Sequence, residues 1–310
     1  MNDEALIRIV AEALQKIQAG VERQTPHLAR QILAWIQSLC PDRPVESYWT
    51  DPEAFPLLFT PWWLEQTLCS TPDSLFQLDL VYSSINMYYY IRLIDNLMDG
   101  DVPTDLHLLP ALGFFHTEFQ RPYHRYFNHA HPFWHDFTTL WFHSAEVTIL
   151  DARMSEFDAA QFTNIAAQKT CAAKIPMAAV CYKYDRTDIL PVWSQFSDRF
   201  GCWSQMLNDT LDWLKDSQYE TGTFFLSEAN RRKHPTESVT DWVIREGGQW
   251  GMEILEMWMA ELKALAQGLA SPGLIAYLDT RVAILAERRH VLFNGLQNLA
   301  KLRLALNRNL

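Results

Sequence analysis

Apolar residues recur at helical spacing along almost the whole chain, and this pattern constrains its fold more than any other feature. The pattern is clear in EALIRIVAEALQKIQAGV (4–21), in HLARQILAWIQSL (27–39) and in a long apolar stretch from about 76 to 99. Glycine is scarce, with 11 among 310 residues, and no alternating strands are joined by Asn-Gly or Asp-Gly turns. The sequence therefore predicts an all-α fold and argues against an all-β or doubly wound one.

The rest of the chain continues in the same way. Further helices are predicted at 113–127, 133–152, 188–218, 239–268 and 273–307. Loops are predicted at 41–57, 101–112 and 217–238. Residues 155–184 predict one helix or a broken pair, with the break at Pro176. Because there is no internal repeat, low-complexity tract or linker, we expect a single domain over 1–310.

Composition and charge exclude several classes of partner. The formal net charge is −11 and no basic run stands out, which argues against nucleic acid or an anionic membrane surface as the main partner. The N-terminus lacks the features of a signal peptide, and no run of 18 apolar residues predicts a transmembrane segment. The cysteines are odd in number, have no CxxC spacing and lie among apolar neighbours, which predicts reduced, buried thiols in a cytoplasmic protein.

An acidic stripe lies on the helix predicted at 76–99. With about 3.6 residues per turn, Tyr88, Arg92, Asp95 and Asp99 fall on one face, while apolar side chains occupy the other faces. Two carboxylates one turn apart on a partly buried face repel each other unless a cation or an arginine compensates them. This arrangement predicts a cation site, although a solvated acidic face is the simpler alternative.

A second stripe has the same character. In FGCWSQMLNDTLDWLKDSQ, the residues Gln205, Asn208, Asp212 and Asp216 share a face over three turns. Carboxylate and amide oxygens, without cysteine or histidine, suit hard cations such as Mg²⁺. Mg²⁺ takes one or two protein carboxylates and fills its other positions with water and phosphate oxygens. Two such stripes facing each other across a cavity would hold a diphosphate between Mg²⁺ ions.

These stretches resemble the motifs of a known superfamily. YYYIRLIDNLMDGD resembles the first aspartate motif of squalene and phytoene synthases, and FGCWSQMLNDTLDWLKD resembles the second motif of class I isoprenoid synthases. Asn208, Asp212 and Asp216 have the spacing of the metal triad of terpene synthases. AAQKTCAAK resembles the element with which polyprenyl synthases hold the allylic diphosphate, here Lys169 and Thr170. The resemblance covers about 75–235 and implies the isoprenoid synthase fold, a bundle of long helices around a central apolar cavity.

The resemblance also implies a set of site residues. The metal ligands would be Asp95, Asp99, Asn208, Asp212 and Asp216, of which all but Asp216 are also the expected catalytic residues; whether Asp101 and Asp209 join them is open. The cofactor would be a cluster of Mg²⁺ ions bound together with the substrate. The substrate would be bound by Arg92, Lys169, Thr170, Gln205, Arg232 and Arg289, with Tyr88, Phe200 and Trp203 as aromatic walls. Plain core packing is the alternative role for each aromatic side chain.

The departures from the family patterns narrow the expected activity. Polyprenyl synthases carry a Gly-Lys-x-x-Arg segment and two arginines after the first aspartate motif, whereas here the nearest equivalents are HLARQILAW and VPTDLHLLP. Head-to-tail elongation is therefore not expected. We expect a Mg²⁺-dependent terpene synthase that ionises one linear prenyl diphosphate and converts the cation to a terpene, with homodimer formation left open. The alternatives are head-to-head prenyl transfer, as in squalene or phytoene synthase, and a catalytically silent protein that binds prenyl diphosphates.

Two further segments have alternative interpretations. The polar and basic segment 217–238 is either a lid that closes on the diphosphate or an ordinary surface loop. His124, His129, His131 and His135 suggest a zinc site by their number. Pro132 interrupts the spacing between the last two, and neither an HExxH pattern nor a cysteine joins them, so we expect no metal there.

Overall fold

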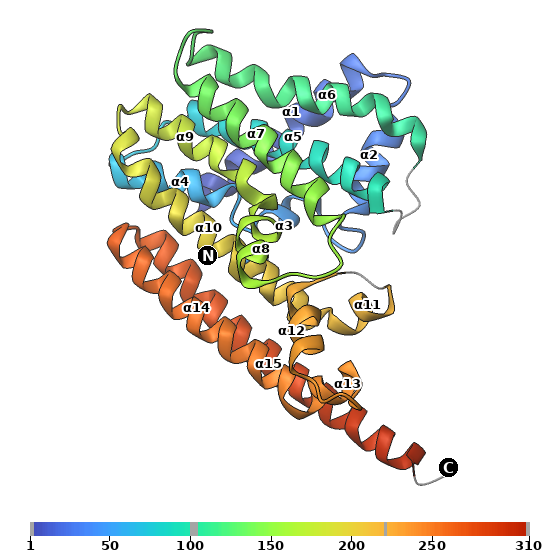
Figure 1. The fold of residues 1–310 in the computed structure, drawn as a ribbon. Coiled ribbons are helices and arrows are strands. Elements are labelled where there is room, and N and C mark those ends of the chain that lie inside the picture. The colour runs from blue at the N-terminus through green and yellow to red at the C-terminus, as the bar shows by residue number, and fades with distance from the viewer. Residues whose placement is uncertain (1–2, 100–104, 220–221, 308–310) are drawn as a thin grey trace. The chain divides into compact units, whose positions relative to one another are not determined.

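A computed structural model describes residues 3–99, 105–219 and 222–307 of the chain. Every regular element in these ranges is a helix, and the two longest, α5 (Ser74–Asp99) and α15 (Pro272–Asn307), have 26 and 36 residues (Figure 1). The all-α prediction is therefore confirmed. In the same ranges, no helix combines the length and the hydropathy needed to cross a membrane.

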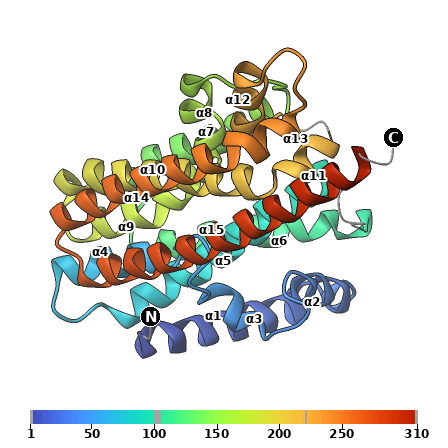
Figure 2. The ribbon, with the colours of Figure 1, turned by 90° about the horizontal axis from the view of Figure 1, so that it is seen from below.

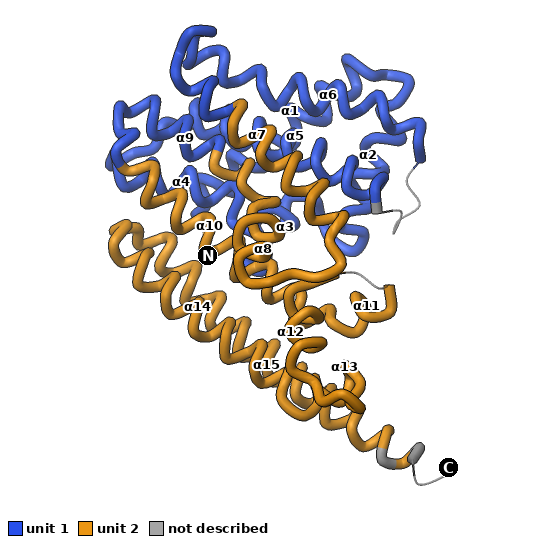
Figure 3. The backbone as a smooth tube through the Cα atoms, in the orientation of Figure 1, with its two compact units in different colours: residues 1–137, 175–188 blue, residues 138–174, 189–310 orange. Residues whose placement is uncertain are grey.

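The helices group into two compact units, which Figure 3 distinguishes by colour. Unit 1 comprises residues 1–137 and 175–188, and unit 2 comprises residues 138–174 and 189–310. Each unit is described by itself below. The expectation of one domain over 1–310 stays a prediction.

Unit 1 is built around α5, which packs against α1 (Glu4–Gln24) and α6 (Leu109–Gln120). The buried residues of α1 recur every three or four positions, as the apolar pattern of the sequence predicts. Because α5 carries apolar side chains on most faces, neighbours can cover it on more than one side. The other elements of this unit are α2 (Ala29–Ser38), α3 (Val45–Trp49), α4 (Phe59–Leu68), η1 (Leu106–Leu108), η2 (Arg121–Arg125) and nearly all of α9 (Lys174–Lys183).

Unit 2 is built around α10 (Leu190–Leu211), which contacts the 3₁₀ segment η3 (Ala166–Ala173), α14 (Gly248–Gly268) and α12 (Phe224–Arg232). Figure 2 shows α14 and α15 side by side, and the short turn between them makes them antiparallel. The remaining elements are most of α7 (Phe133–Asp151), α8 (Ala159–Asn164), η4 (Thr187–Ile189, shared with unit 1), α11 (Trp213–Gln218), α13 (Val239–Trp242) and the π-helical turn η5 (Val243–Gly247).

Each of the three predicted loops contains helical residues. The predicted loop 41–57 contains α3, the predicted loop 101–112 contains η1 and the start of α6, and the predicted loop 217–238 contains α12. The start of α12 is stabilised by the Thr223 side chain, which accepts a hydrogen bond from the Leu226 N–H, and its first residues are buried. Its polar residues gather at the end of the helix, which is why the segment has the average composition of a loop.

The predicted helix 188–218 is interrupted once. The chain leaves helical geometry at Asp212, where φ is −94° and ψ is 6°, and α11 begins at the next residue. The predicted break at Pro176 is also displaced, because the change from 3₁₀ to α-helix occurs at Lys174. Pro176 then occupies the first turn of α9, where an N–H has no partner within the helix and a proline removes no bond.

Candidate functional site

The acidic wall of unit 2 consists of three residues of the second stripe: Asn208, Asp212 and Asp216. They keep their spacing across the interruption at Asp212. The Asp212 N–H donates to the Asn208 carbonyl oxygen (2.8 Å), and the Asp216 N–H donates to the Asp212 carbonyl oxygen (3.0 Å). The chain therefore keeps helical spacing across the junction between α10 and α11. Asn208 and Asp212 are exposed and Asp216 is half-buried, whereas Trp213 turns into the core and holds α11 in place.

The side chains of the acidic wall, Asn208, Asp212 and Asp216, border one cavity of about 150 Å³ within unit 2. It brings together five residues that the sequence predicted: Lys169, Gln205, Asn208, Asp212 and Asp216. It also includes Asp209, whose role the sequence left open, and a set of residues that the sequence did not single out: Asp151, Phe157, Ala166, Gly222, Thr223 and Phe224.

Lys169 supplies the cation of this cavity. It lies in η3, and its Nζ is 2.5 Å from Oδ2 of Asp151, the last residue of α7. Both side chains are partly exposed, so the pair is accessible to a ligand. Thr170 is exposed and does not border the cavity; its hydroxyl donates to the Ala167 carbonyl oxygen at 3.4 Å.

Asp209 is the most deeply buried acid in the cavity, with 3% of its surface exposed. Its carboxylate accepts hydrogen bonds from the Gln205 amide (2.8 Å) and from the Phe224 backbone N–H (3.2 Å). Burial raises the pKa of Asp209 to about 7, against the lowering effect of the Gln205 hydrogen bond, and the charge of Asp216 adds to the increase. The predicted substrate-binding role of Gln205 therefore competes with an observed role in holding Asp209.

The donor atoms on the acidic wall suit a hard cation. Asn208, Asp212 and Asp216 offer an amide and two carboxylates, a set that matches the one or two carboxylates that Mg²⁺ takes from a protein. Burial and then the charge of Asp212 raise the pKa of Asp216, a repulsion that a bound cation would relieve. Among the described residues, no group of three or more histidine, cysteine, aspartate or glutamate side chains is arranged to hold a metal. A metal here would thus depend on the asparagine and on non-protein ligands as well.

The first stripe lies on α5 in unit 1. Arg92 Nη1 is 2.7 Å from Asp95 Oδ2, and both side chains are about 40% exposed, with values of 42% and 38%. This is the ordinary pairing of residues three apart on a helix. Asp99 is the last residue of α5, and its side chain and the whole of Asp101 lie outside the described residues. Tyr88 is half-buried, and its hydroxyl is hydrogen-bonded to that of Tyr48.

Phe200 and Trp203 pack into the core of unit 2 and do not border the cavity. The Trp203 Nε1–H donates to the Leu255 carbonyl oxygen at 3.0 Å, which ties α10 to α14. The Phe200 ring lies 5.8 Å from the Tyr277 ring. The structure therefore gives both aromatics a packing role, and their role as cavity walls stays a prediction.

Arg232 and Arg289, which the sequence predicted to bind the substrate, each pair with a nearby glutamate. Arg232 Nε is 2.7 Å from Glu228 Oε2, and its guanidinium lies 4.5 Å from the Trp250 ring. Arg289 forms an ion pair with Glu256 and donates to the Gln249 side chain at 3.1 Å. Neither arginine borders the cavity, so their binding of substrate also stays a prediction.

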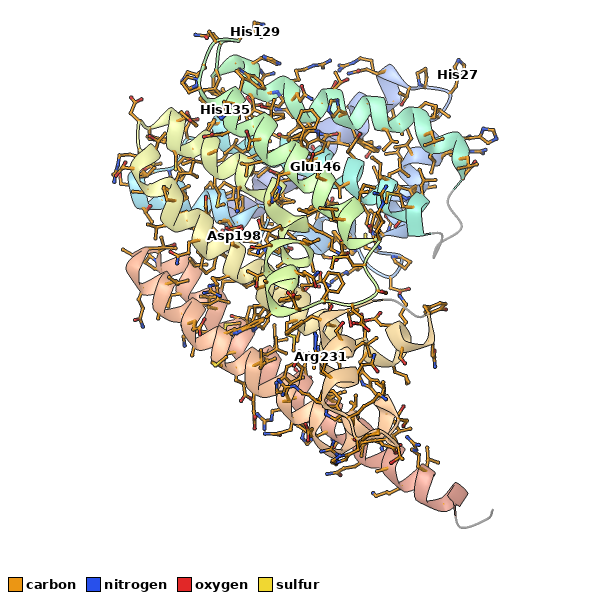
Figure 4. All side chains as sticks on the ribbon, in the orientation of Figure 1. His27, His129, His135, Glu146, Asp198 and Arg231 are labelled. Carbon is orange, nitrogen blue, oxygen red and sulfur yellow. The ribbon has the colours of Figure 1, made fainter. Side chains whose placement is uncertain are left out.

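The histidines make packing and backbone contacts. The His124 ring stacks on Trp134 with centroids 4.4 Å apart, and His129 lies 5.2 Å from His124. His131 Nδ1 accepts a hydrogen bond from the backbone N–H two residues later, at 3.2 Å. Figure 4 places His129 in the loop before α7 and His135 on α7 itself.

The segment before α8 closes one side of the cavity, and α12 holds it there. The Phe157 N–H donates to the Ser227 hydroxyl (2.9 Å), and the Phe157 carbonyl oxygen accepts from Arg231 (Nη1 at 3.1 Å). Arg231 is labelled on α12 in Figure 4. A Cβ on Gly222 would lie 2.4 Å from the Met154 carbonyl oxygen, so only glycine allows this close approach. Asp151 ends α7 as Asp99 ends α5, so an acid at the end of a predicted helix is the sequence signal that could have identified it.

Comparisons with known proteins support the fold. No protein-family model matches the sequence, and no curated protein matches it either. Among solved structures, the chain is similar to farnesyl pyrophosphate synthase of T. brucei, solved in complex with a dichlorobenzothiophene acetic acid. The TM-score is 0.50 with 11% identity, and the match covers 96% of this chain and 100% of that chain. At this identity the similarity concerns the fold alone, and the chain has an all-α fold resembling that of the isoprenoid synthases.

Proposed function

We propose that the protein is a Mg²⁺-dependent enzyme acting on a prenyl diphosphate, and specifically a terpene synthase that ionises one linear prenyl diphosphate. The observation that carries the proposal is that Asn208, Asp212 and Asp216 share one cavity with Lys169. Oxygen donors beside an ammonium group form a site for a metal-bound oxyanion. The isoprenoid synthase fold and the name of the matched structure are consistent with a prenyl diphosphate as that oxyanion.

Each residue of the cavity has a defined part in this proposal. Asn208, Asp212 and Asp216 would hold Mg²⁺, which when bound draws charge from the diphosphate leaving group. Lys169 exchanges part of its ion pair with Asp151 for a hydrogen bond to a diphosphate oxygen. Asp209, held by Gln205 and the start of α12, positions the wall and is not assigned to the metal.

The first stripe enters the proposal through its motif. Arg92, Asp95 and Asp99 resemble the first aspartate motif of squalene and phytoene synthases, and the partial exposure of Arg92 and Asp95 leaves them accessible to a ligand. We assign Asp95 and Asp99 to metal binding and Arg92 to the diphosphate on this basis.

Prenyl transfer is the second candidate. The matched structure is a farnesyl pyrophosphate synthase by name, which favours a reaction that joins two prenyl units. The absence of the isopentenyl-binding segments from the sequence favours ionisation of a single substrate instead. A silent binding protein remains the third candidate.

One experiment separates the three. The protein is incubated with Mg²⁺ and prenyl diphosphates of about 10 to 25 carbon atoms, singly and in pairs with isopentenyl diphosphate; released diphosphate is measured and hydrocarbon extracts are analysed by gas chromatography. A cyclic or rearranged product from one substrate supports the terpene synthase. A doubled or elongated chain supports the transferase. Intact substrate in every tube would overturn both. In the variant Asp212→Asn, which keeps the shape of the side chain and removes its charge, diphosphate release should fall if Asp212 binds the metal.

A further inference from the structure

Unit 1 contains a hollow of about 240 Å³ with several charged residues in its lining, which the proposed function does not use. It lies between α1, α5 and the junction of α6 with η2. Its charged lining consists of four cations and two carboxylates: Lys16, Arg23, Arg121, Arg125, Asp79 and Glu118. An excess of two positive charges in one hollow is unexpected in a chain whose formal net charge is −11.

Both carboxylates are buried and fully engaged. Asp79 accepts two hydrogen bonds from Arg125 Nη1, at 2.9 and 2.8 Å, and one from the Tyr126 hydroxyl at 2.9 Å. Glu118 pairs with Arg121 Nη1 at 2.8 Å and accepts a hydrogen bond from the Tyr82 hydroxyl at 2.7 Å. Each buried acid therefore has its own arginine, as burial of a charge requires.

The other two cations are not needed for that purpose. Lys16 is 3.7 Å from Glu12 in an exposed pair on its own helix, and Arg23 forms no ion pair within the described part of the chain. Arg23 nevertheless borders the hollow together with Arg121 and Tyr82. Burial and then the hydrogen bond to Glu118 raise the pKa of Tyr82, and the charges of Arg121 and Arg23 lower it.

The shape and the donors together define a ligand class. Ala19 and Gly20 of α1 border the hollow with a small side chain and with none. A Cβ on Gly20 would lie 3.2 Å from the Phe114 ring. Arginine guanidinium groups present several N–H donors in a plane, which suits phosphate oxygens. We propose that this hollow binds a small phosphate-bearing anion with at least two negative charges, such as diphosphate or a phosphate monoester.

The test measures binding without metal, so that it is independent of the proposed catalytic site. The full chain in EDTA and about 0.15 M salt, where charges more than roughly 8 Å apart are screened, is titrated by calorimetry with inorganic diphosphate, inorganic phosphate and glycerol phosphate. We expect saturable binding of at least one of these probes. Arg23→Gln should weaken it roughly tenfold, as for the loss of one charge-assisted hydrogen bond. Arg23 is exposed and the buried acids pair with Arg121 and Arg125, so this variant leaves no buried acid unpaired.

Two controls keep the result specific. Arg8→Gln removes the same charge from an exposed position on the same helix, outside the hollow, and should leave binding unchanged. Asp212→Asn alters the proposed metal site and should also leave it unchanged. Absence of saturable binding, equal binding by Arg23→Gln and the unaltered protein, or loss of binding in Asp212→Asn would each overturn the proposal. None of these outcomes bears on whether the enzyme turns over prenyl diphosphates with Mg²⁺.

Discussion

The Lys169 ammonium lies 2.5 Å from a carboxylate oxygen of Asp151, a residue 18 positions earlier in the chain. The pair joins η3 to the end of α7 at the edge of the acidic cavity. Asp151 thus neutralises and orients the lysine, and the proposed diphosphate would have to compete with it.

Replacement of Lys169 by methionine tests this pair. We expect Lys169→Met to lower the rate of diphosphate release about 100-fold, as for the loss of one donor to a developing oxyanion. Stability should change by no more than about 1 kcal/mol, because the side chain is 33% exposed. The matched control is Lys263→Met, which breaks a similar pair with Asp279 (2.6 Å) away from the cavity. Unchanged release by Lys169→Met would contradict the assigned role.

The two acidic stripes are tested separately. Asp95→Ala and Asn208→Ala should each abolish diphosphate release while the helical circular dichroism signal stays intact. Both side chains are at least partly exposed, so their removal leaves no cavity in the core. Full activity in Asp95→Ala would refute its assignment as a metal ligand.

The hold of α12 on the segment before α8 predicts a stability effect. Ser227→Ala leaves the buried Phe157 N–H without its acceptor, which should lower the free energy of unfolding by about 1 to 3 kcal/mol. Urea denaturation measures the change. Thr163→Ala is the control, because its hydroxyl bonds only an exposed helix carbonyl (2.9 Å), and it should change stability by less than about 0.5 kcal/mol. Equal effects of the two variants would mean that the Phe157 contact is unimportant.

Buried thiols predict a dependence of stability on pH. Burial raises the pKa of Cys171 and Cys202 to about 11 and of Cys181 to about 12, from an ordinary value of 9.0. The folded state therefore keeps these protons above pH 9, where the unfolded state loses them. Stability should fall as pH rises from 8 towards 11, and the loss between pH 8 and pH 10 should be about 1.3 kcal/mol per thiol.

Denaturation of the unaltered protein and of Cys202→Ala at pH 8 and pH 10 measures this effect. The variant should lose less stability between the two pH values than the unaltered protein. Thiol reagents at pH 8 should leave Cys171, Cys181 and Cys202 unmodified until urea is added. Rapid modification of the folded protein at these three positions would show that they are not buried.

Two glycines should respond to alanine with opposite signs. A Cβ on Gly201 would lie 2.8 Å from the Ala167 carbonyl oxygen and 3.0 Å from the Thr170 hydroxyl, so Gly201→Ala should destabilise the protein by about 1 to 3 kcal/mol. A Cβ on Gly295, inside α15, would have no neighbour within 4 Å, so Gly295→Ala should stabilise it by about 0.5 to 1 kcal/mol. Thermal unfolding of both variants tests the pair, and a shift in the same direction would contradict the packing at Gly201.

Helical periodicity was sufficient to predict the long helices, but it did not predict the short ones. The stripe through α5 and the pattern of α14 and α15 repeat over many turns, so the prediction of helices there is confirmed. The helix α3 has 5 residues and α12 has 9, too few turns for a period to be distinguished from a loop. Their stability comes from burial and from the cap at Thr223, which spacing alone does not show.

The site residues that share one helical stripe were predicted from the sequence. Those that are placed by contacts between distant segments were missed. Asn208, Asp212 and Asp216 came from spacing on α10 and α11. Asp151 and Phe157 lie on the cavity because of their ion pair and hydrogen bonds, partners that are 18 and 70 residues away in the sequence. Phe200 and Trp203 share α10 with the wall but turn towards α14 and α15, a direction that depends on where the neighbours lie.

The hydrogen bond from the Phe224 N–H to Asp209 joins two residues that are 15 positions apart and so closes a loop of the chain. Its two ends are fixed by this contact and by the packing of α12 on α10, not by the number of residues between them. The free energy of closing a loop changes only slowly with its length, by about 0.6 kcal/mol for each doubling. A change in the length of this loop would therefore alter the free energy of closing it only slightly, provided that Asp212, Asp216 and Gly222 keep their places in the cavity. The contact between the aspartate and the helix start thus identifies related sites better than the number of residues between them.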